Sequence, residues 1–291
     1  MESIINRGTG LLVIEAVNSN VNGDPDRESD PRQRHDGRGE ISPVSFKRKV
    51  RDLVLHKDGP VWKEISKSLE IKEDDYLKYD LLEKRDIDRQ KVIKELKENT
   101  FLEKYWDARI FGNTFLEGDL SDKIQTGVAQ FGLAVSISPI KIERMTTTKV
   151  APVEDDKSRG MAPLAFRIVQ HGVYCMPFFI NATAASKTNC KQKDIDLLLK
   201  LIPYAYTNTA SYIRPQVNIR YAFYVEHNSP LGKYNDFEII DALTPKRIGD
   251  AEKPSTSWKD YDSEGLKQQI KELEEKLKNK TQKVRDLMGE M

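Results

Sequence analysis

The sequence has 291 residues, with 47 lysines and arginines against 46 aspartates and glutamates, and a formal net charge of +1. Such a length allows one large domain or two modest ones around a buried core. No apolar run is long enough to span a membrane and no signal-peptide pattern opens the chain, so we expect a cytoplasmic protein. Near-neutral charge argues against a protein that coats nucleic acid through bulk positive charge. Any cations that bind nucleic acid must therefore gather on one face.

The sequence has few cysteines and histidines for metal binding or covalent catalysis. Cys175 and Cys190 are the only cysteines, and the four histidines are scattered without the paired spacing of a metal site. The chain also lacks a phosphate-binding glycine-rich loop, a Walker motif and a nucleophile elbow. We therefore expect two reduced thiols, no metal and no cofactor.

The first half opens with a core strand and a polar loop. Residues 10–17 are apolar apart from one acid, and residues 18–26 (NSNVNGDPD) are rich in turn-forming types. Ser42 and Pro43 predict a helix start, because serine caps helices and proline fits the first helical position. Apolar residues then recur on one side of the helix, and the other side carries the cations Lys47, Arg48 and Arg51. We expect the Gly-Pro pair at 59–60 to end this helix.

The middle of the chain predicts a charged insertion followed by a β-rich half. We interpret residues 62–104 as a solvated helical insertion, which the apolar segment 105–115 (YWDARIFGNTF) ends on a glycine turn. The later elements that we predict are strands at 124–142, 168–180 and 217–225 and a helix at 193–205. A polar segment at about 143–170 predicts a projecting hairpin or loop.

The end of the chain, residues 263–291, predicts an amphipathic helix. Apolar residues recur at alternating four- and three-residue steps from Leu266 to Leu287, but Lys280 occupies one heptad position. The helix is a short coiled coil at best, and docking onto its own domain or onto a neighbouring subunit explains the pattern equally well. A filament assembled by this coil without RNA is one alternative function, which deletion of residues after Ser263 would test.

In chain order these elements give two β-α-β passes, which fit an α+β fold with a ferredoxin-like, RNA-recognition-motif-like sheet and long insertions. Four collinear segments between residues 10 and 232 resemble the backbone subunit of type I CRISPR surveillance (Cascade) complexes, of the repeat-associated mysterious protein (RAMP) superfamily. Subtype I-C and I-B members are the most similar. The segments are NSNVNGDP with the helix SPVSFKRKVRD, then DARIFGNTF, then GVAQFGLAVSISPIKIERMTTTK, and finally HGVYCMPFFINATAASKT with RYAFYVEHNSPLG. One departure is Ala129, since family members often have proline before Gln130.

The resemblance implies a hand-like fold and a non-enzymatic function. It implies a modified palm within residues 1–262, helical fingers at about 60–104, a β-hairpin thumb at about 143–170, and the C-terminal helix at 263–291. Such a subunit polymerises along the CRISPR guide RNA (crRNA) and presents it for pairing with DNA. The implied partners are the guide RNA, the target DNA strand through the guide, further copies of the chain, and the guide 5′-end-capping and large subunits of Cascade.

A guide-binding scaffold needs cations, hydroxyls and backbone N–H groups that contact phosphates, and it leaves the base edges free. Without the resemblance, the cationic helix face is an ordinary solvated surface; with it, the helix is the best phosphate site. Met161 is a candidate wedge between neighbouring bases. The complete set of predicted RNA-binding residues is Asn18, Asn20, Asn22, Lys47, Arg48, Arg51, Gln130, Arg144, Thr146, Thr147, Thr148, Lys149, Arg159, Met161 and Arg214. Four tyrosines can stack on bases, although core or interface packing is their more common use: Tyr204, Tyr206, Tyr212 and Tyr221.

The rival hypothesis is a metal-dependent ribonuclease of the same superfamily that uses loop aspartates. Paired carboxylates can hold magnesium for phosphoryl transfer. The candidates are Asp24, Asp26, Asp30 and Asp36, with Asp155 and Asp156 at the predicted hairpin tip. Turn-rich loops use aspartate for conformational reasons, and no general base accompanies these residues in a recognisable motif. We therefore favour the non-enzymatic hypothesis.

Overall fold

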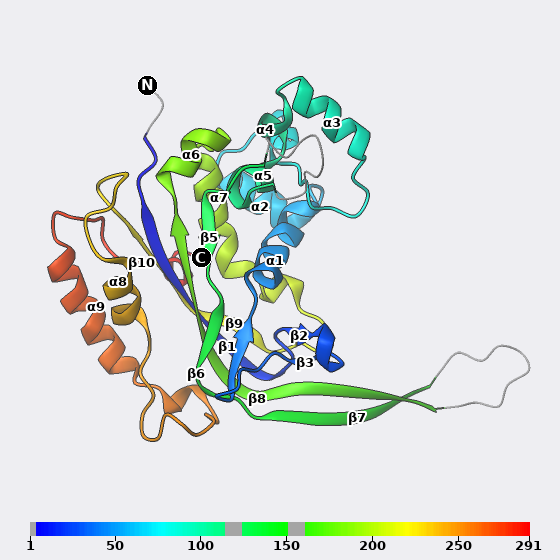
Figure 1. Ribbon diagram of the computed structural model, residues 1–291, viewed down its shortest axis with the longest axis vertical. Coiled ribbons are helices and arrows are strands. Elements are labelled where there is room, and N and C mark those ends of the chain that lie inside the picture. Colours follow the sequence, from blue (N-terminus) through cyan, green and yellow to red (C-terminus); the bar gives the residue numbers. More distant parts are fainter. Residues whose placement is uncertain (1–3, 114–123, 151–160) are drawn as a thin grey trace, which may run out of the picture.

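The computed structural model describes residues 4–113, 124–150 and 161–291. Its centre is an antiparallel sheet with the strand order β10–β9–β1–β8–β6–β4, and helices cover both faces of this sheet (Figure 1). The strands of this path are β1 (Gly8–Ser19), β4 (Arg38–Ile41), β6 (Ala134–Pro139), β8 (Met161–Ile180), β9 (Val217–Glu226) and β10 (Arg285–Asp286). The mixed class of helices and sheet expected from the sequence is confirmed. None of the described helices is long and apolar enough to cross a membrane.

Strand β1 lies in the middle of the sheet, and its side chains alternate between two hydrophobic cores. Leu12 and Ile14 point into the larger core, whereas Leu11 and Val13 point into the smaller one. This alternation follows from the two-residue period of a strand. Because both faces are covered, the strand appears in the sequence as a continuous apolar run, as predicted for residues 10–17.

Helices from both halves of the chain cover the larger core. They contribute large buried side chains such as Phe46, Trp62 and Trp106. The elements are α1 (Pro43–Leu55), α2 (Pro60–Ser68), α5 (Trp106–Phe111), α6 (Ala182–Thr188) and α7 (Gln192–Leu201). The predicted helix at 193–205 corresponds to α7 and a short 3-10 turn that follows it.

Helix α1 begins where the sequence predicted but ends before the predicted Gly-Pro pair. The Ser42 hydroxyl accepts a hydrogen bond from the Ser45 N–H (3.2 Å), and Pro43 occupies the first turn. The helix stops at Leu55, before the Gly-Pro pair at 59–60. That pair instead starts α2, because Gly59 is its N-cap and Pro60 is its first residue.

The charged insertion is not simply a solvated set of helices. Two further helices, α3 (Arg89–Lys97) and α4 (Phe101–Lys104), share a small core of their own. Its buried members include Leu82, Val92 and Phe101. The insertion therefore has enough apolar surface to hold a defined shape. Its many charged residues made this core hard to recognise in the sequence.

The predicted strand at 124–142 is interrupted, and the predicted hairpin is present. β5 (Ala129–Phe131) and β6 both pair with β8, and between them the Gly132 N–H donates to the Pro177 carbonyl (2.8 Å). β7 (Ile142–Val150) then pairs with the first half of β8 in a ribbon that extends beyond the body of the molecule (Figure 1). The hairpin expected at about 143–170 is confirmed in this backbone pairing.

The C-terminal segment is not one helix over 263–291. Helix α9 covers Ser263–Leu277, after which the chain turns and adds β10 to the edge of the sheet. Leu266, Leu273 and Leu277 are buried in the smaller core together with α8 (Asp236–Leu243). The apolar side of α9 is thus covered by its own chain, which was one of the alternatives. Deleting residues after Ser263 would uncover this core, so it cannot test coil-driven assembly cleanly.

A buried polar network attaches the start of α8 to the sheet and predicts acid sensitivity. Asp236 accepts hydrogen bonds from Thr9 Oγ1 (2.5 Å) and from Arg7, and buried His227 Nε2 lies 3.5 Å from its carboxylate. Burial opposes ionisation of Asp236, but these donors and the charges of Arg7 and His227 leave its pKa lowered. Burial lowers the pKa of His227 below its usual 6.5.

The unfolded chain therefore binds more protons than the folded chain as the pH falls below about 6.5, and stability is lost in that direction. We expect the urea midpoint to fall from pH 7.5 to pH 5.5. His227→Gln should flatten this dependence, whereas the same change at exposed His35 should leave it intact. An equal pH dependence in both variants would contradict the assignment to His227.

Candidate nucleic-acid interface

The cations of α1 occupy three different environments, although the sequence grouped them on one face. Arg48 is exposed and pairs with Asp52 one turn later (2.9 Å). Lys47 is half-buried with its Nζ 5.3 Å from the centre of the Phe111 ring, and burial followed by the nearby charge of Arg51 lowers its pKa. The prediction that Arg51 lies on the outer face is wrong, because its side chain is only 4% exposed.

Arg51 instead belongs to a buried ion pair between α1 and the segment DARIF. Its Nε lies 2.8 Å from the Asp107 carboxylate, and its guanidinium also contacts Glu83 (2.9 Å). Asp107 additionally accepts hydrogen bonds from the Leu82 N–H (2.6 Å) and the Glu83 N–H (3.1 Å). With its charge compensated inside the protein, Arg51 holds the insertion against α1.

Lys49, which was not among the predicted residues, lies near enough to Arg214 for the two positive charges to interact. Its pKa is lowered by burial first and then by the charge of Arg214. Within the described residues, neither side chain has a carboxylate within 4.0 Å. Lys49 Nζ contacts only the Thr209 carbonyl (3.3 Å), and Arg214 Nε is buried without a partner. Asp52 offsets part of the positive charge at Lys49, but neither cation has a carboxylate in direct contact, so the two form a site suited to an anion. We call this pair the Lys49–Arg214 site.

The asparagines of the first loop shape the neighbourhood of this site. Asn20 is buried and donates to the Ser29 carbonyl (2.8 Å), and its N–H donates to the Ile213 carbonyl (2.8 Å). Asn22 is also buried, and its side-chain oxygen accepts from the N–H and hydroxyl of Ser42, both at 2.9 Å. Only Asn18 is exposed, with a left-handed φ of 44°. Asn20 and Asn22 therefore fix the loop against residues 211–214 and the start of α1.

The hairpin carries the second group of predicted residues, only some of which are described. Arg144 and Thr146 are exposed on β7. Thr147, Thr148 and Lys149 pair through their backbones with Leu164, Pro163 and Ala162, and Met161 is the first residue of β8. The side chains of Thr147, Thr148, Lys149 and Met161, and the whole of Arg159, Asp155 and Asp156, lie outside the described residues. Gln130 lies apart on β5, where its side chain donates to the Gly127 carbonyl (2.7 Å).

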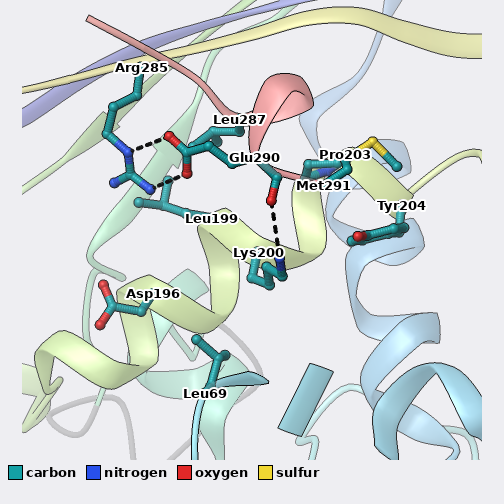
Figure 2. Close-up of a pocket in the computed structure, with 10 residues that line it drawn as sticks. All are labelled: Leu69, Asp196, Leu199, Lys200, Pro203, Tyr204, Arg285, Leu287, Glu290 and Met291. Atoms are coloured by element: carbon teal, nitrogen blue, oxygen red, sulfur yellow. Dashed lines mark hydrogen bonds and ion pairs between the residues drawn. The ribbon is translucent and has the colours of Figure 1, made fainter. Parts of the chain in front are cut away.

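A cavity beside α7 is lined in part by the C-terminal turn. It has a volume of about 220 Å³ and lies between the end of α2, α7 and residues 285–291 (Figure 2). Arg285 forms two hydrogen bonds with the Glu290 carboxylate (2.9 and 2.7 Å), and Lys200 Nζ donates to the Glu290 carbonyl (3.3 Å). These contacts hold the chain end in place and use the charges that line the cavity.

Comparison with known proteins identifies the family. A model of CRISPR-associated protein Cas7 matches residues 6–264. The chain belongs to the Cas7 family. A subunit of a solved "CRISPR RNA-guided surveillance complex, pre-nicking" is similar over 94% of this chain and 90% of its own, with 15% identity and a TM-score of 0.54. A second, from a "CRISPR RNA-guided surveillance complex", covers 93% and 86% at 15% identity and a TM-score of 0.47. No curated protein matches.

Two of the sequence segments that carry the family resemblance make buried contacts between the insertion, α7 and the sheet. DARIFGNTF supplies Asp107, which pairs with Arg51, and Arg109, which pairs with Asp194 of α7 (2.7 Å). The glycine of GVAQF is required by close packing, since a Cβ on Gly127 would lie 2.1 Å from the Phe111 carbonyl carbon. These segments therefore connect the insertion to the sheet of the Cas7-family fold.

Three of the four loop aspartates of the nuclease hypothesis, Asp24, Asp30 and Asp36, have structural partners. Asp24 lies 3.6 Å from Arg32, and Asp30 lies 2.9 Å from Arg167. Asp36 accepts from the Arg38 N–H (3.0 Å). Among the residues that the structure describes, no cluster of three or more potential ligands for a metal ion is present. Nothing in the described part of this Cas7-family chain or in its matches favours the nuclease hypothesis.

Proposed function

We propose that this chain is a non-catalytic, guide-RNA-binding backbone subunit of a type I CRISPR surveillance complex, located in the cytoplasm. The family match over residues 6–264 is the single observation that carries this function. Its subtype, which we place with I-C and I-B, rests on the four sequence segments alone. The proposed partners are the guide RNA, the DNA strand that pairs with it, further copies of the chain, and the capping and large subunits.

The proposed palm is RNA-recognition-motif-like, and its strand order supports this. In the two β-α-β passes, β1, β6, β8 and β9 are the first, second, third and fourth strands. The path β9–β1–β8–β6 therefore has the order 4-1-3-2, with the first strand between the fourth and the third, as in a ferredoxin-like sheet. In this proposal α2–α4 form the fingers and the β7–β8 hairpin is the thumb. An isolated two-stranded ribbon is only marginally stable in water, so a projecting hairpin requires a surface to lie on.

The RNA path that we propose avoids the open sheet face used by simple recognition motifs. In this chain, α8 and α9 cover the face opposite the larger core, where Leu11, Val13 and Phe223 are buried. Of the predicted RNA-binding residues, Arg48, Arg144 and Thr146 are exposed, and we place the RNA along these side chains and the Lys49–Arg214 site. Contacts from these side chains would hold phosphates and leave base edges free for the target DNA.

The first experiment measures the RNA content and particle size of the protein purified in moderate salt, before and after ribonuclease. We expect large particles that hold RNA of defined length and that release RNA at high salt, because phosphate contacts exchange with counterions. A nucleic-acid-free monomer that ignores added CRISPR RNA would overturn the proposal. Cleavage of added RNA in magnesium or manganese would overturn the non-catalytic assignment.

A further inference from the structure

Tyr212 presents an aromatic ring to solvent next to the Lys49–Arg214 site. Its side chain is 74% exposed, and its ring lies 4.9 Å from that of Phe166 on β8, tilted by 58°. Phe166 lies where the hairpin leaves the sheet, so the two rings join separate parts of the chain. A tyrosine that covered only its own core would be buried, as Tyr206 in the same loop is.

The loop that carries Tyr212 is held rigidly. The Arg214 N–H donates to the Ser211 carbonyl (2.8 Å), which closes a four-residue turn around Tyr212. The turn is tied to the end of β1 by the bond from the Asn20 N–H to the Ile213 carbonyl (2.8 Å) and by one from the Gln216 N–H to Ser19 Oγ (3.1 Å). The ring is therefore presented in a fixed position, which lowers the entropic cost of binding a ligand.

A third apolar side chain extends this surface. Met145 pairs directly with Phe166 across the hairpin, so the two side chains lie on the same face of the ribbon. Met145 is 49% exposed. Met145, Phe166 and Tyr212 form an apolar surface, and Tyr212 lies two residues before Arg214 of the Lys49–Arg214 site in the same loop.

We propose that Tyr212, supported by Phe166 and Met145, is a stacking platform for one unpaired base of the RNA, while the Lys49–Arg214 site holds a neighbouring phosphate. This inference rests on the proposed function. Aromatic faces beside a cationic groove are the usual means of holding single-stranded nucleic acid, and stacking tolerates every base because each base has a π-face. Such tolerance suits a protein whose guides differ in sequence.

The test compares Tyr212→Ala and Tyr212→Phe with Phe237→Ala, which removes a 73% exposed aromatic ring from α8. The probe is a single-stranded RNA of guide length with 2-aminopurine at successive positions, titrated into ribonuclease-treated protein. We expect Tyr212→Ala to weaken binding by roughly 5- to 100-fold and to remove the 2-aminopurine fluorescence change at the stacked position. Tyr212→Phe and Phe237→Ala should both bind like the wild type.

Each result separates the platform from the proposed function. Wild-type affinity in Tyr212→Ala, with the wild-type protein binding RNA, overturns the platform alone. Failure of the wild-type protein to bind RNA overturns the proposed function and the platform with it. If Tyr212→Ala leaves RNA affinity unchanged but prevents association of RNA-free copies, the surface is a protein contact and the platform is likewise wrong. Because Tyr212 is exposed, we expect Tyr212→Ala and Tyr212→Phe to have the same urea midpoint as the wild type.

Discussion

Reversing both charges of the Lys49–Arg214 site is expected to abolish RNA-dependent assembly. Each cation is expected to form a charge-assisted hydrogen bond with a phosphate, worth about 1.5–3 kcal/mol. Loss of two such bonds corresponds to a decrease in affinity of roughly 10²- to 10⁴-fold, before repulsion by the new carboxylates is added. The variant is Lys49→Glu with Arg214→Glu, and the measurement is RNA affinity at fixed salt together with particle size.

The matched control is Arg48→Glu, which makes the same type of change one residue from Lys49. Arg48 is exposed and already paired with Asp52, so we expect a smaller loss. Neutral variants give a second readout. Lys49→Met with Arg214→Met should reduce the slope of log affinity against log salt by about 0.7 for each phosphate that the variant no longer binds. Equal losses in the site variant and in Arg48→Glu, or an unchanged slope, would place the phosphates elsewhere.

The sequence grouped the cations of α1 on one face, whereas the structure gives them different environments, and the reason is geometric. Lys47, Arg48, Lys49 and Arg51 follow one another on α1, and only tertiary packing decides which has an acid opposite it. Arg51 meets Asp107, which comes from a segment 56 residues away. No local pattern contains that pairing. The signal for Lys49 was present, since it belongs to the same cationic run, but Arg214 becomes its neighbour only through the fold.

The elements of the core were predictable, whereas the ends of the chain were less so. The apolar run at 10–17 and the Ser-Pro start of α1 are local features, and the structure has both. The C-terminal heptad pattern is also local, but a helix and a following strand can bury the same spacing of apolar residues. Val284 and Leu287 are buried beyond the end of α9, beside the strand β10. Similarly, the sequence predicted that Asn20 and Asn22 belong to a polar RNA-binding loop. Both are instead buried through contacts with residues 29 and 42, which no local pattern reveals.

Asp194→Ala is expected to be strongly destabilising, because it leaves the buried guanidinium of Arg109 without its charge partner. Arg109 is 5% exposed and makes two hydrogen bonds to Asp194, from Nε (3.0 Å) and Nη2 (2.7 Å). Its remaining donors reach the carbonyls of Leu102 (2.7 Å), Glu103 (3.2 Å) and Lys78 (2.8 Å). Removing the carboxylate leaves the guanidinium charge buried and uncompensated, which typically costs about 3–5 kcal/mol.

We expect this loss in the free energy of urea unfolding, with Asp196→Ala, two residues along the same helix, as the control. Asp196 is half-buried and accepts one hydrogen bond from Gln192, so its removal should cost about 1 kcal/mol or less. The double variant Arg109→Met with Asp194→Leu should recover much of the stability, because it removes both charges from the interior. If Asp194→Ala alone were as stable as Asp196→Ala, the pair would not be what holds the insertion to α7. The docking of that insertion would then have to rest on its apolar contacts.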